Sequence, residues 1–535
     1  MSSFAEKQLP LRRLRFGNVD ARYEVTSRDP NDEKHFRTSF VEPTGMNVDE
    51  FIDGHRFFVH GAKGSGKTSL LRFIELKVTD QKSLSKFISF ATEISDPERD
   101  KICRISGIDV YEQDGVEVSN NNAVEMWMIF ILRHLGRLIE ENRSDFTSHK
   151  SISVFCELMK KFYDGEDNKG LLRWLSIALK TGRYKFKSKY IDASLKGPEK
   201  EDEKEYPVSY VIDQSFRLLR DLGWEGLRGL YVIFDELNLS FASKAAHKRD
   251  IILIRDLIIA IDRLNMFFVS ERKPVYILGS ARSEVLHALN APTHEINKIL
   301  ADRGRELRWF ANTAGAEWPI IRLLESKINA SEKLAGLKPS DGVMERYFYR
   351  DIIGFGPRDF VVETTWCNPR DIVSLFGEAA AHALPNEAVF GGPVIARVME
   401  QYSTAAWREK AEELSVEYAP QEIQSIKKML LNFARHFKLL SFEKNWRNKA
   451  ENDPTMTMMI SKFKSSKIIE DLYRIGVLGQ SSKEPTEHAQ SFNQHWAYRG
   501  DNTFDISSWL VVHKALWPEL RLGKLRAGVD GRERG

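Results

Sequence analysis

The chain contains 535 residues, with 79 lysines and arginines against 76 aspartates and glutamates, so its formal net charge is only +3. A chain of this length exceeds a single hydrophobic core, and about two to four domains are expected. The near balance of charge gives no overall field for a nucleic acid or a membrane, so any such surface must be local. Three widely spaced cysteines, Cys103, Cys156 and Cys367, form no CxxC pair, which argues against a zinc site or disulfide framework. No apolar run is long enough to span a bilayer, and together these features predict a cytoplasmic protein without a membrane segment.

The first 50 residues are polar and are predicted to form an arm that packs on the first domain. A short helix over 47–52 and a core strand over 56–60 should follow. Further along, the apolar patterns predict strands over 86–90 and 107–111 and a helix over 123–141.

A glycine-rich stretch after the first strand matches the pattern GxxxxGK[ST] at every fixed position. It lies between an apolar segment, 57–59, and an amphipathic segment, 70–74, which is the strand, loop and helix context in which this pattern binds phosphate. Glycines reach backbone angles closed to other residues, so the loop can wrap a phosphate and point its N–H groups inward. The predicted binding residues are Gly61, Ala62, Lys63, Gly64, Ser65, Gly66, Lys67, Thr68 and Ser69.

Two side chains of this loop carry specific chemistry. Lys67 would place a positive charge on the β and γ phosphates of a nucleotide, and Thr68 would offer a hydroxyl to Mg²⁺. The start of the following helix adds a partial positive charge.

Residues 151–206 change in composition and are predicted to be an insertion. Within them the stretch 184–190 alternates aromatic residues with Lys185, Lys187 and Lys189, as expected of one strand. That lysine face either contacts a nucleic-acid strand or is simply solvated. The charge run over 199–205 is typical of an exposed loop.

An unbroken apolar run, 230–234, ends in Asp235 and Glu236. Continuous apolarity indicates a central parallel strand covered on both faces, so the two acids must lie at its carboxyl end, the edge at which such sheets bind ligands. Asp235 would hold Mg²⁺, and Glu236 would orient or deprotonate the water that attacks the γ phosphate.

After a helix over 249–264, another buried strand over 275–280 ends in Ser280 and is followed by Arg282. We expect this strand to lie between the first strand and that of Asp235, so that Ser280 or Arg282 senses the γ phosphate. Arg282 could equally close the turn in a salt bridge. The last strand is expected over 307–310; the preceding Arg303 and Arg305 are either solvated or reach a neighbouring subunit's nucleotide.

The chain then becomes helical from 318 onward. Of two Pro-Arg-Asp triplets, the second begins a predicted helix over 372–383, with Asn368 as its cap and Pro369 in its first turn. Arg370 is the candidate that swings onto a nucleotide from a helical lid; its alternative is a pair with Asp371 or solvent. Arg358, in the first triplet, is the weaker candidate.

From residue 418 onward, helices precede a predicted hairpin with Gly500-Asp501-Asn502 near its tip, the outline of a winged helix. We therefore expect an α/β protein built on a parallel sheet flanked by helices. The predicted domains are an arm (1–50), a nucleotide-binding domain (51–330, with the insertion 151–206), a helical lid (331–417), a winged-helix-like α+β domain (418–522) and a disordered tail (523–535).

With these pieces placed, the chain resembles the P-loop ATPases of the STAND and AAA-like groups, signal-transducing NTPases often encoded among bacterial anti-phage defence genes. The resemblance spans 14–380 and is carried by Gly61–Thr68, Asp235-Glu236, a Phe-Gly-x-x-x-Ala segment at 16–21 and Ser280-x-Arg282. A likeness to their winged helix rests on 472–476 and 495–499. The resemblance implies that ATP binding and slow hydrolysis switch the lid and the winged helix between two arrangements.

The function expected is therefore an ATP-driven molecular switch with ATP and Mg²⁺ as ligands. Its partners would be further copies of the chain, a separate effector protein, or both. One alternative is a DNA-binding module that uses the winged helix and the three lysines at 185, 187 and 189. The other, a phosphotransferase, is disfavoured by Glu236, because a carboxylate that activates water would waste ATP. ATP is expected rather than GTP because the sequence holds no guanine-reading NKxD motif.

Overall fold

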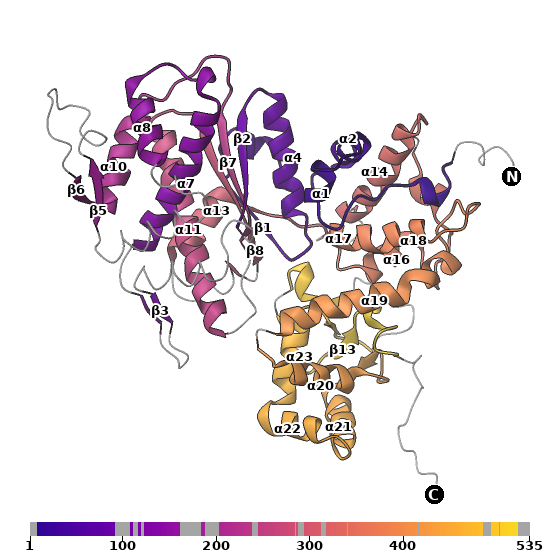
Figure 1. Cartoon of the computed structure of the whole chain (residues 1–535). Coiled ribbons are helices and arrows are strands. Elements are labelled where there is room, and N and C mark those ends of the chain that lie inside the picture. The colour runs from indigo at the N-terminus through magenta and orange to yellow at the C-terminus, as the bar shows by residue number, and fades with distance from the viewer. Residues whose placement is uncertain are drawn as a thin grey trace, which may run out of the picture. The chain divides into compact units, whose positions relative to one another are not determined.

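The computed structural model describes residues 8–90, 108–110, 116–118, 122–160, 183–187, 203–237, 244–283, 285–286, 294–311, 317–339, 341–415, 417–484, 494–501 and 503–522. By their contacts, the residues form two compact units (Figure 1). Residues 45–63 and 67–307 form the sheet unit. Residues 1–44, 64–66 and 308–535 form the helical unit.

The sheet unit is built on five parallel strands, which confirms the predicted α/β class. In spatial order they are β2 (Leu84–Ser89), β7 (Leu230–Leu237), β8 (Val275–Arg282), β1 (Phe58–Gly61) and β9 (Gly304–Glu306). As predicted, β8 lies between β1 and β7. The apolar residues of β7 are buried, as continuous apolarity requires of a central strand with both faces covered.

Helices flank this sheet. Figure 1 shows α4 on one side of it and α7 and α11 on the other. Among the described residues of the unit, the α-helices are α3 (Asp49–Ile52), α4 (Lys67–Asp80), α7 (Asn122–Glu141), α8 (Lys150–Lys160), α10 (Val208–Leu219), α11 (Lys244–Ser270) and α13 (His294–Arg303). Two further antiparallel pairs join β3 (Ile108–Val110) to β4 (Val116–Val118) and β5 (Arg183–Lys187) to β6 (Glu203–Pro207).

The last strand of the sheet begins earlier than predicted. It runs over Gly304–Glu306, and residues 307–310 are not part of it. Gly304 allows the tight exit from α13, because a side chain there would lie 2.5 Å from the carbonyl oxygen of Leu300. Trp309 leaves the sheet because its side chain is buried in the core of the helical unit. Burial in the tertiary structure therefore overrides the local strand pattern.

Residues 45–50 belong to the sheet unit, but most of the N-terminal arm, residues 1–44, belongs to the helical unit. Its apolar side chains Leu9, Leu11, Leu14 and Phe16 are buried in the core of that unit. Phe16 packs its ring against those of Phe376 and Phe390. The arm carries η2 (Leu11–Arg13), α1 (Arg22–Val25) and α2 (Pro30–Ser39), and α2 packs on α14 (Pro319–Leu334).

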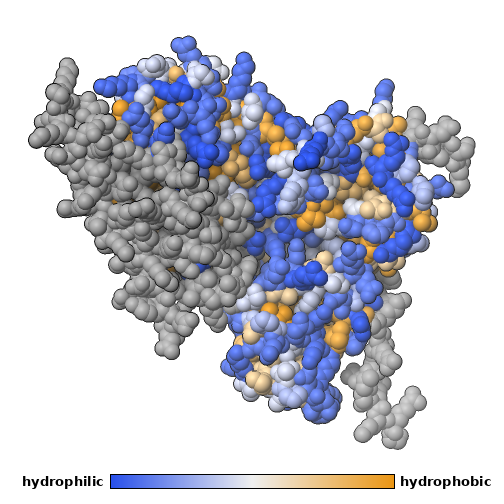
Figure 2. Space-filling model, in the orientation of Figure 1, coloured by the Kyte–Doolittle hydropathy of each residue, from blue (hydrophilic) through white to orange (hydrophobic). Residues whose placement is uncertain are grey.

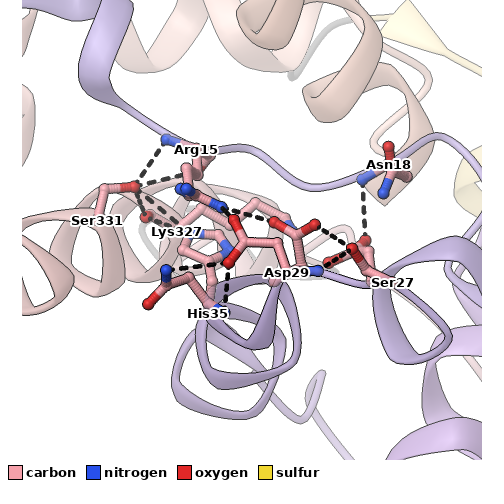
Figure 3. A network of polar contacts seen from close by, with 10 residues as sticks. Arg15, Asn18, Ser27, Asp29, His35, Lys327 and Ser331 are labelled. Atoms are coloured by element: carbon pink, nitrogen blue, oxygen red, sulfur yellow. Dashed lines mark hydrogen bonds and ion pairs between the residues drawn. The ribbon is translucent and has the colours of Figure 1, made fainter.

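Polar contacts fasten the arm to α14 (Figure 3). The Ser331 hydroxyl accepts the Arg15 N–H and lies 2.9 Å from the Lys327 carbonyl oxygen. His35 Nε2 donates to the same carbonyl at 3.1 Å. Arg15 also pairs with Asp29 and Asp32 on its own arm. Burial raises the pKa of Glu24 on the arm and lowers that of Lys327 on α14, so an acid and a base lie desolvated where the arm meets α14.

The buried His35 should make the helical unit sensitive to acid. Burial, and then repulsion from Lys327 and Arg15, lowers its pKa to about 4, against the weaker opposite effects of the hydrogen bond to the Lys327 carbonyl oxygen and of Asp32. Between about pH 6.5 and 4, His35 is therefore protonated in the unfolded chain but neutral in the folded chain. The free energy of unfolding should fall by up to about 1.4 kcal/mol per pH unit as the pH drops through this range. The raised pKa of Glu24 acts in the opposite direction.

The check is urea unfolding of wild type and His35→Gln between pH 4 and 8. His35→Gln should flatten the pH profile, whatever its stability at pH 8. The exposed His382 provides the matched control, and His382→Gln should keep the wild-type slope. A wild-type slope in His35→Gln would contradict the assignment.

The remaining helices of the helical unit share one hydrophobic core with the arm. They are α15 (Val343–Tyr347), α16 (Pro357–Thr364), α17 (Pro369–Ile372), the π-helical turn η5 (Val373–Gly377), α18 (Glu378–Ala381), α19 (Gly392–Leu414), α20 (Pro420–Leu430), α21 (Leu439–Ala450), α22 (Pro454–Lys462) and α23 (Ser465–Arg474). Its sheet is antiparallel, in the order β10 (His436–Phe437), β13 (Trp509–Val512), β11 (Leu478–Ser481) and β12 (Gln494–His495).

The predicted hairpin tip at 500–502 is wrong. β11 lies between β12 and β13 and pairs with both, so the segment that holds Gly500 joins two strands that are not neighbours. The burial of β11 and β13 in the core fixes this order, which local turn residues could not reveal.

The surface in the view of Figure 2 is mainly hydrophilic, with hydrophobic residues in small separate patches. Among the described residues, no helix has both the length and the apolar composition that crossing a bilayer requires. Cys156 and Cys367 are buried free thiols, while Cys103 lies outside the described residues.

Candidate functional site

Polar side chains gather at the carboxyl edge of the parallel sheet, where the ends of its strands meet. Ser89 ends β2, Asp235 and Glu236 lie near the end of β7, and β8 ends in Ser280, Ala281 and Arg282. The register places Ser89 opposite Asp235 and Arg282 opposite Gly61. The glycine-rich loop, Gly61–Thr68, leaves the same edge after β1. The structure therefore brings together the loop and the strand ends predicted from the sequence.

The two acids lie in a β-bulge. Phe234 pairs with Gly279 and Leu237 with Ala281, so Asp235 and Glu236 together face a single residue of β8. The extra residue interrupts the regular alternation of side chains between the two faces of the sheet, so that two adjacent side chains can both lie at the carboxyl edge. Glu236 has a φ of 60°, a left-handed conformation that a non-glycine residue adopts at a cost of about 1–3 kcal/mol. Such strain concentrates at functional sites.

The Asp235 carboxylate is buried, with an exposed fraction of 1%, and accepts two hydroxyl groups. Thr68 Oγ1 donates to Asp235 Oδ2 at 2.7 Å, and Ser280 Oγ donates to Oδ1 at 2.5 Å. The hydroxyl groups come from the loop and from the neighbouring strand. They fix both oxygens of the carboxylate and link the loop to the centre of the sheet.

Glu236 is half-buried beside this cluster, and the Ser89 hydroxyl donates to its Oε2 atom. Ser89 ends the neighbouring strand β2 and so orients Glu236 from outside both the glycine-rich loop and the Asp235-Glu236 pair. Sequence reasoning assigns this serine no role, although a hydroxyl at the end of the strand beside the acids is a signal that could identify it.

The glycine-rich loop has the features of an anion-binding turn. Gly64 and Gly66 have φ angles of 82° and 90°, which glycine adopts without steric cost. The Lys67 ammonium donates to the carbonyl oxygens of Gly61 and Ala62, at 2.8 and 2.9 Å, so it lies over the loop. The buried Ser65 hydroxyl has no hydrogen-bond partner among the described residues. A buried polar atom without a partner is costly, and a phosphate oxygen would satisfy it.

The tip of the loop, Gly64–Gly66, belongs by its contacts to the helical unit. Trp309 Nε1 donates to the Ser65 carbonyl oxygen at 2.8 Å, and the Arg370 backbone N–H donates to the Gly64 carbonyl oxygen at 3.4 Å. A side chain at Gly66 would contact the Pro369 ring at 3.4 Å. Trp309 was predicted as a strand residue without a role, and its contact with the loop was missed.

Arg370 lies against the loop tip, near Gly64, but its guanidinium pairs with Glu409 at 3.3 Å and not with Asp371. The helix begins at Pro369, as predicted, and its run to Ala381 contains a π-helical turn. The predicted side-chain cap by Asn368 is absent. Instead, Asp371 accepts the Trp366 N–H at 2.8 Å, and burial raises the pKa of Asp371 to about 7.

The other basic candidates lie as follows. Arg282 is half-buried at the sheet edge. Arg303 lies over the Phe57 ring, and Arg305 pairs with Glu50 at 3.0 Å within the sheet unit. Arg358 pairs with Glu325. The register of β5 and β6 places Lys185 opposite Glu205 and Lys187 opposite Glu203, while Lys189 lies outside the described residues.

Within the described part of the chain, no cluster of three or more histidine, cysteine or carboxylate side chains is placed to hold a metal ion. The possible metal ligands at the sheet edge are the hydroxyl group of Thr68 and the carboxylate of Asp235. That donor set suits Mg²⁺, which usually keeps several waters and binds through one or two carboxylates and substrate phosphates. Comparison with known proteins adds no assignment, since neither a family model nor a curated protein matches the chain.

Proposed function

We propose that the chain is a P-loop ATPase, an ATP-driven switch that passes its nucleotide state to other copies of the chain or to a separate effector. The observation that carries this proposal is the joining of the loop and the strand ends at Asp235. A GK[ST] threonine and a serine from the intervening strand both donate to one buried carboxylate, and a strained glutamate follows it directly.

Each residue has a defined task in this mechanism. The N–H groups of Gly61–Thr68 and the Lys67 ammonium would hold the nucleotide phosphates. Thr68 and Asp235 would hold Mg²⁺, which when bound neutralises charge on the phosphate oxygens. Glu236, with Oε2 held by Ser89, would take the proton from the water that attacks the γ phosphorus as its bond to the bridging oxygen of ADP breaks. Ser280 keeps Asp235 in place, and Arg282 and Arg370 are the candidate γ-phosphate sensors.

A water-activating role for Glu236 favours hydrolysis over phosphotransfer. Its backbone strain is tolerated only where the surrounding structure imposes it, which indicates a fixed role for this side chain. The absence of an NKxD motif from the sequence favours ATP over GTP.

The C-terminal part of the helical unit would act as a winged-helix-like readout. Its sheet order and preceding helices support that proposal. The exposed basic residues Lys467 and Arg474 of α23 both pair with the buried Asp471, which cancels one of their two charges and holds both side chains against their own helix. The partner we propose is therefore a protein, and duplex DNA is included in the assay to test the alternative.

The test is Mg²⁺-dependent ATP hydrolysis by wild type and Asp235→Asn, with and without duplex DNA. Asparagine can accept from one hydroxyl and donate to the other, so the fold should survive while the charge that holds Mg²⁺ is lost. Turnover should fall about 100-fold. Asp221→Asn is the control, because Asp221 also accepts a serine hydroxyl in the sheet unit but lies at an exposed position. Wild-type turnover in Asp235→Asn would refute the proposed site.

A further inference from the structure

The contacts of the loop tip fix two successive peptide groups. In a planar trans peptide, the carbonyl oxygen and the following N–H point in opposite directions. The Ser65 carbonyl oxygen points at the Trp309 indole, so the Gly66 N–H points away from it. The Gly64 carbonyl oxygen points at the Arg370 backbone, so the Ser65 N–H points away from that.

The Trp309 indole is held by the core of the helical unit. Trp309 has an exposed fraction of only 6%, and its ring packs within the main hydrophobic cluster of that unit. The ring also lies 4.0 Å from the position of a side chain at Gly66. The indole therefore cannot turn away without disrupting packed side chains, and it holds the peptide group of the loop tip rigidly.

We propose that Trp309 is a positioning residue for phosphate binding, which presents the Gly66 N–H to the ligand and makes the loop tip part of the helical-unit core. The inference rests on the proposed function and deepens it. Trp309 does not touch the phosphate; it acts through the Ser65 peptide group. Phosphate that binds these N–H groups would then be held by peptide groups whose carbonyl oxygens are fixed by Trp309 and Arg370.

A purely structural role is the competing explanation, because a buried indole N–H needs an acceptor wherever it lies. The chain offers a matched control for this possibility. Trp517, also in the helical unit, donates its Nε1–H to the Val512 carbonyl oxygen at 2.9 Å, at the C-terminal sheet. Trp309→Phe and Trp517→Phe each remove one such hydrogen bond and keep an aromatic ring.

The experiment measures the affinity of both variants for ATP and for inorganic pyrophosphate, together with their melting temperatures. Losing one oriented hydrogen bond should weaken pyrophosphate and ATP binding about fivefold to tenfold in Trp309→Phe and leave Trp517→Phe at wild-type affinity. Equal affinities in the two variants would overturn the positioning role while the proposed function stands. If wild type binds neither ligand, both proposals fail.

A measurement on wild type alone covers the case in which Trp309→Phe does not fold. Pyrophosphate should slow hydrogen exchange both in peptides that cover 61–68 and in those that cover 308–311 and 366–372. Slower exchange confined to 61–68 would overturn the inferred link between the loop and the helical-unit core.

Discussion

Glu236→Gln is expected to bind ATP with an affinity within roughly threefold of wild type and to hydrolyse it about 100- to 1,000-fold more slowly. The side chain keeps its length, and its amide oxygen can still accept the Ser89 hydroxyl, so the bulge and its left-handed backbone should persist. Only the ability to take a proton is lost. Single-turnover hydrolysis and equilibrium binding of labelled ATP separate the two effects.

The matched control for this prediction is Glu271→Gln. Glu271 pairs with Arg220 on the surface of the sheet unit, so the same chemical change there should leave turnover unchanged. Turnover by Glu236→Gln at the wild-type rate would remove Glu236 from the mechanism. Loss of ATP binding in Glu236→Gln would instead show that the glutamate supports the loop and not the water.

The sheet and its acidic edge were predictable because their signals are local. An unbroken apolar run such as 230–234 can only be buried on both faces, and the acids that follow must then lie at the strand end. The glycine-rich motif by itself predicts a strand before the loop and a helix after it. The expected placing of β8 between β1 and β7 is confirmed, and the structure adds that Ser280 at the end of β8 donates to Asp235.

Long-range packing explains what the sequence could not predict. The polar arm around Leu11 and Phe16 joins the helical core across more than 300 residues, and neither its composition nor its position in the chain indicates that choice. The strand pattern around Trp309 was overridden by burial in the same core. The order of β11, β12 and β13 depends on which strand faces are buried. The Ser89 contact depends on a bulge that only the register of β7 and β8 reveals.

Lys67→Ala is expected to abolish measurable ATP binding and hydrolysis, with an affinity loss of about 100-fold or more, since hydrogen bonds to charged groups are worth about 1.5–3 kcal/mol each and the ammonium makes several. Because Lys67 also donates to the carbonyl oxygens of Gly61 and Ala62, alanine could loosen the loop.

Lys67→Met keeps the aliphatic stem and separates lost charge from lost packing, and it should fail to bind ATP as alanine does. Lys77→Ala removes the same charge from the same helix, at a surface pair with Asp49, and should bind ATP as wild type does. Calorimetric titration with ATP and Mg²⁺ measures all three. If Lys67→Ala and Lys67→Met both bind ATP with wild-type affinity, the glycine-rich loop does not hold the phosphates, and the positioning role of Trp309 fails with it. If only Lys67→Ala loses binding, the lysine stem orders the loop and its charge is dispensable.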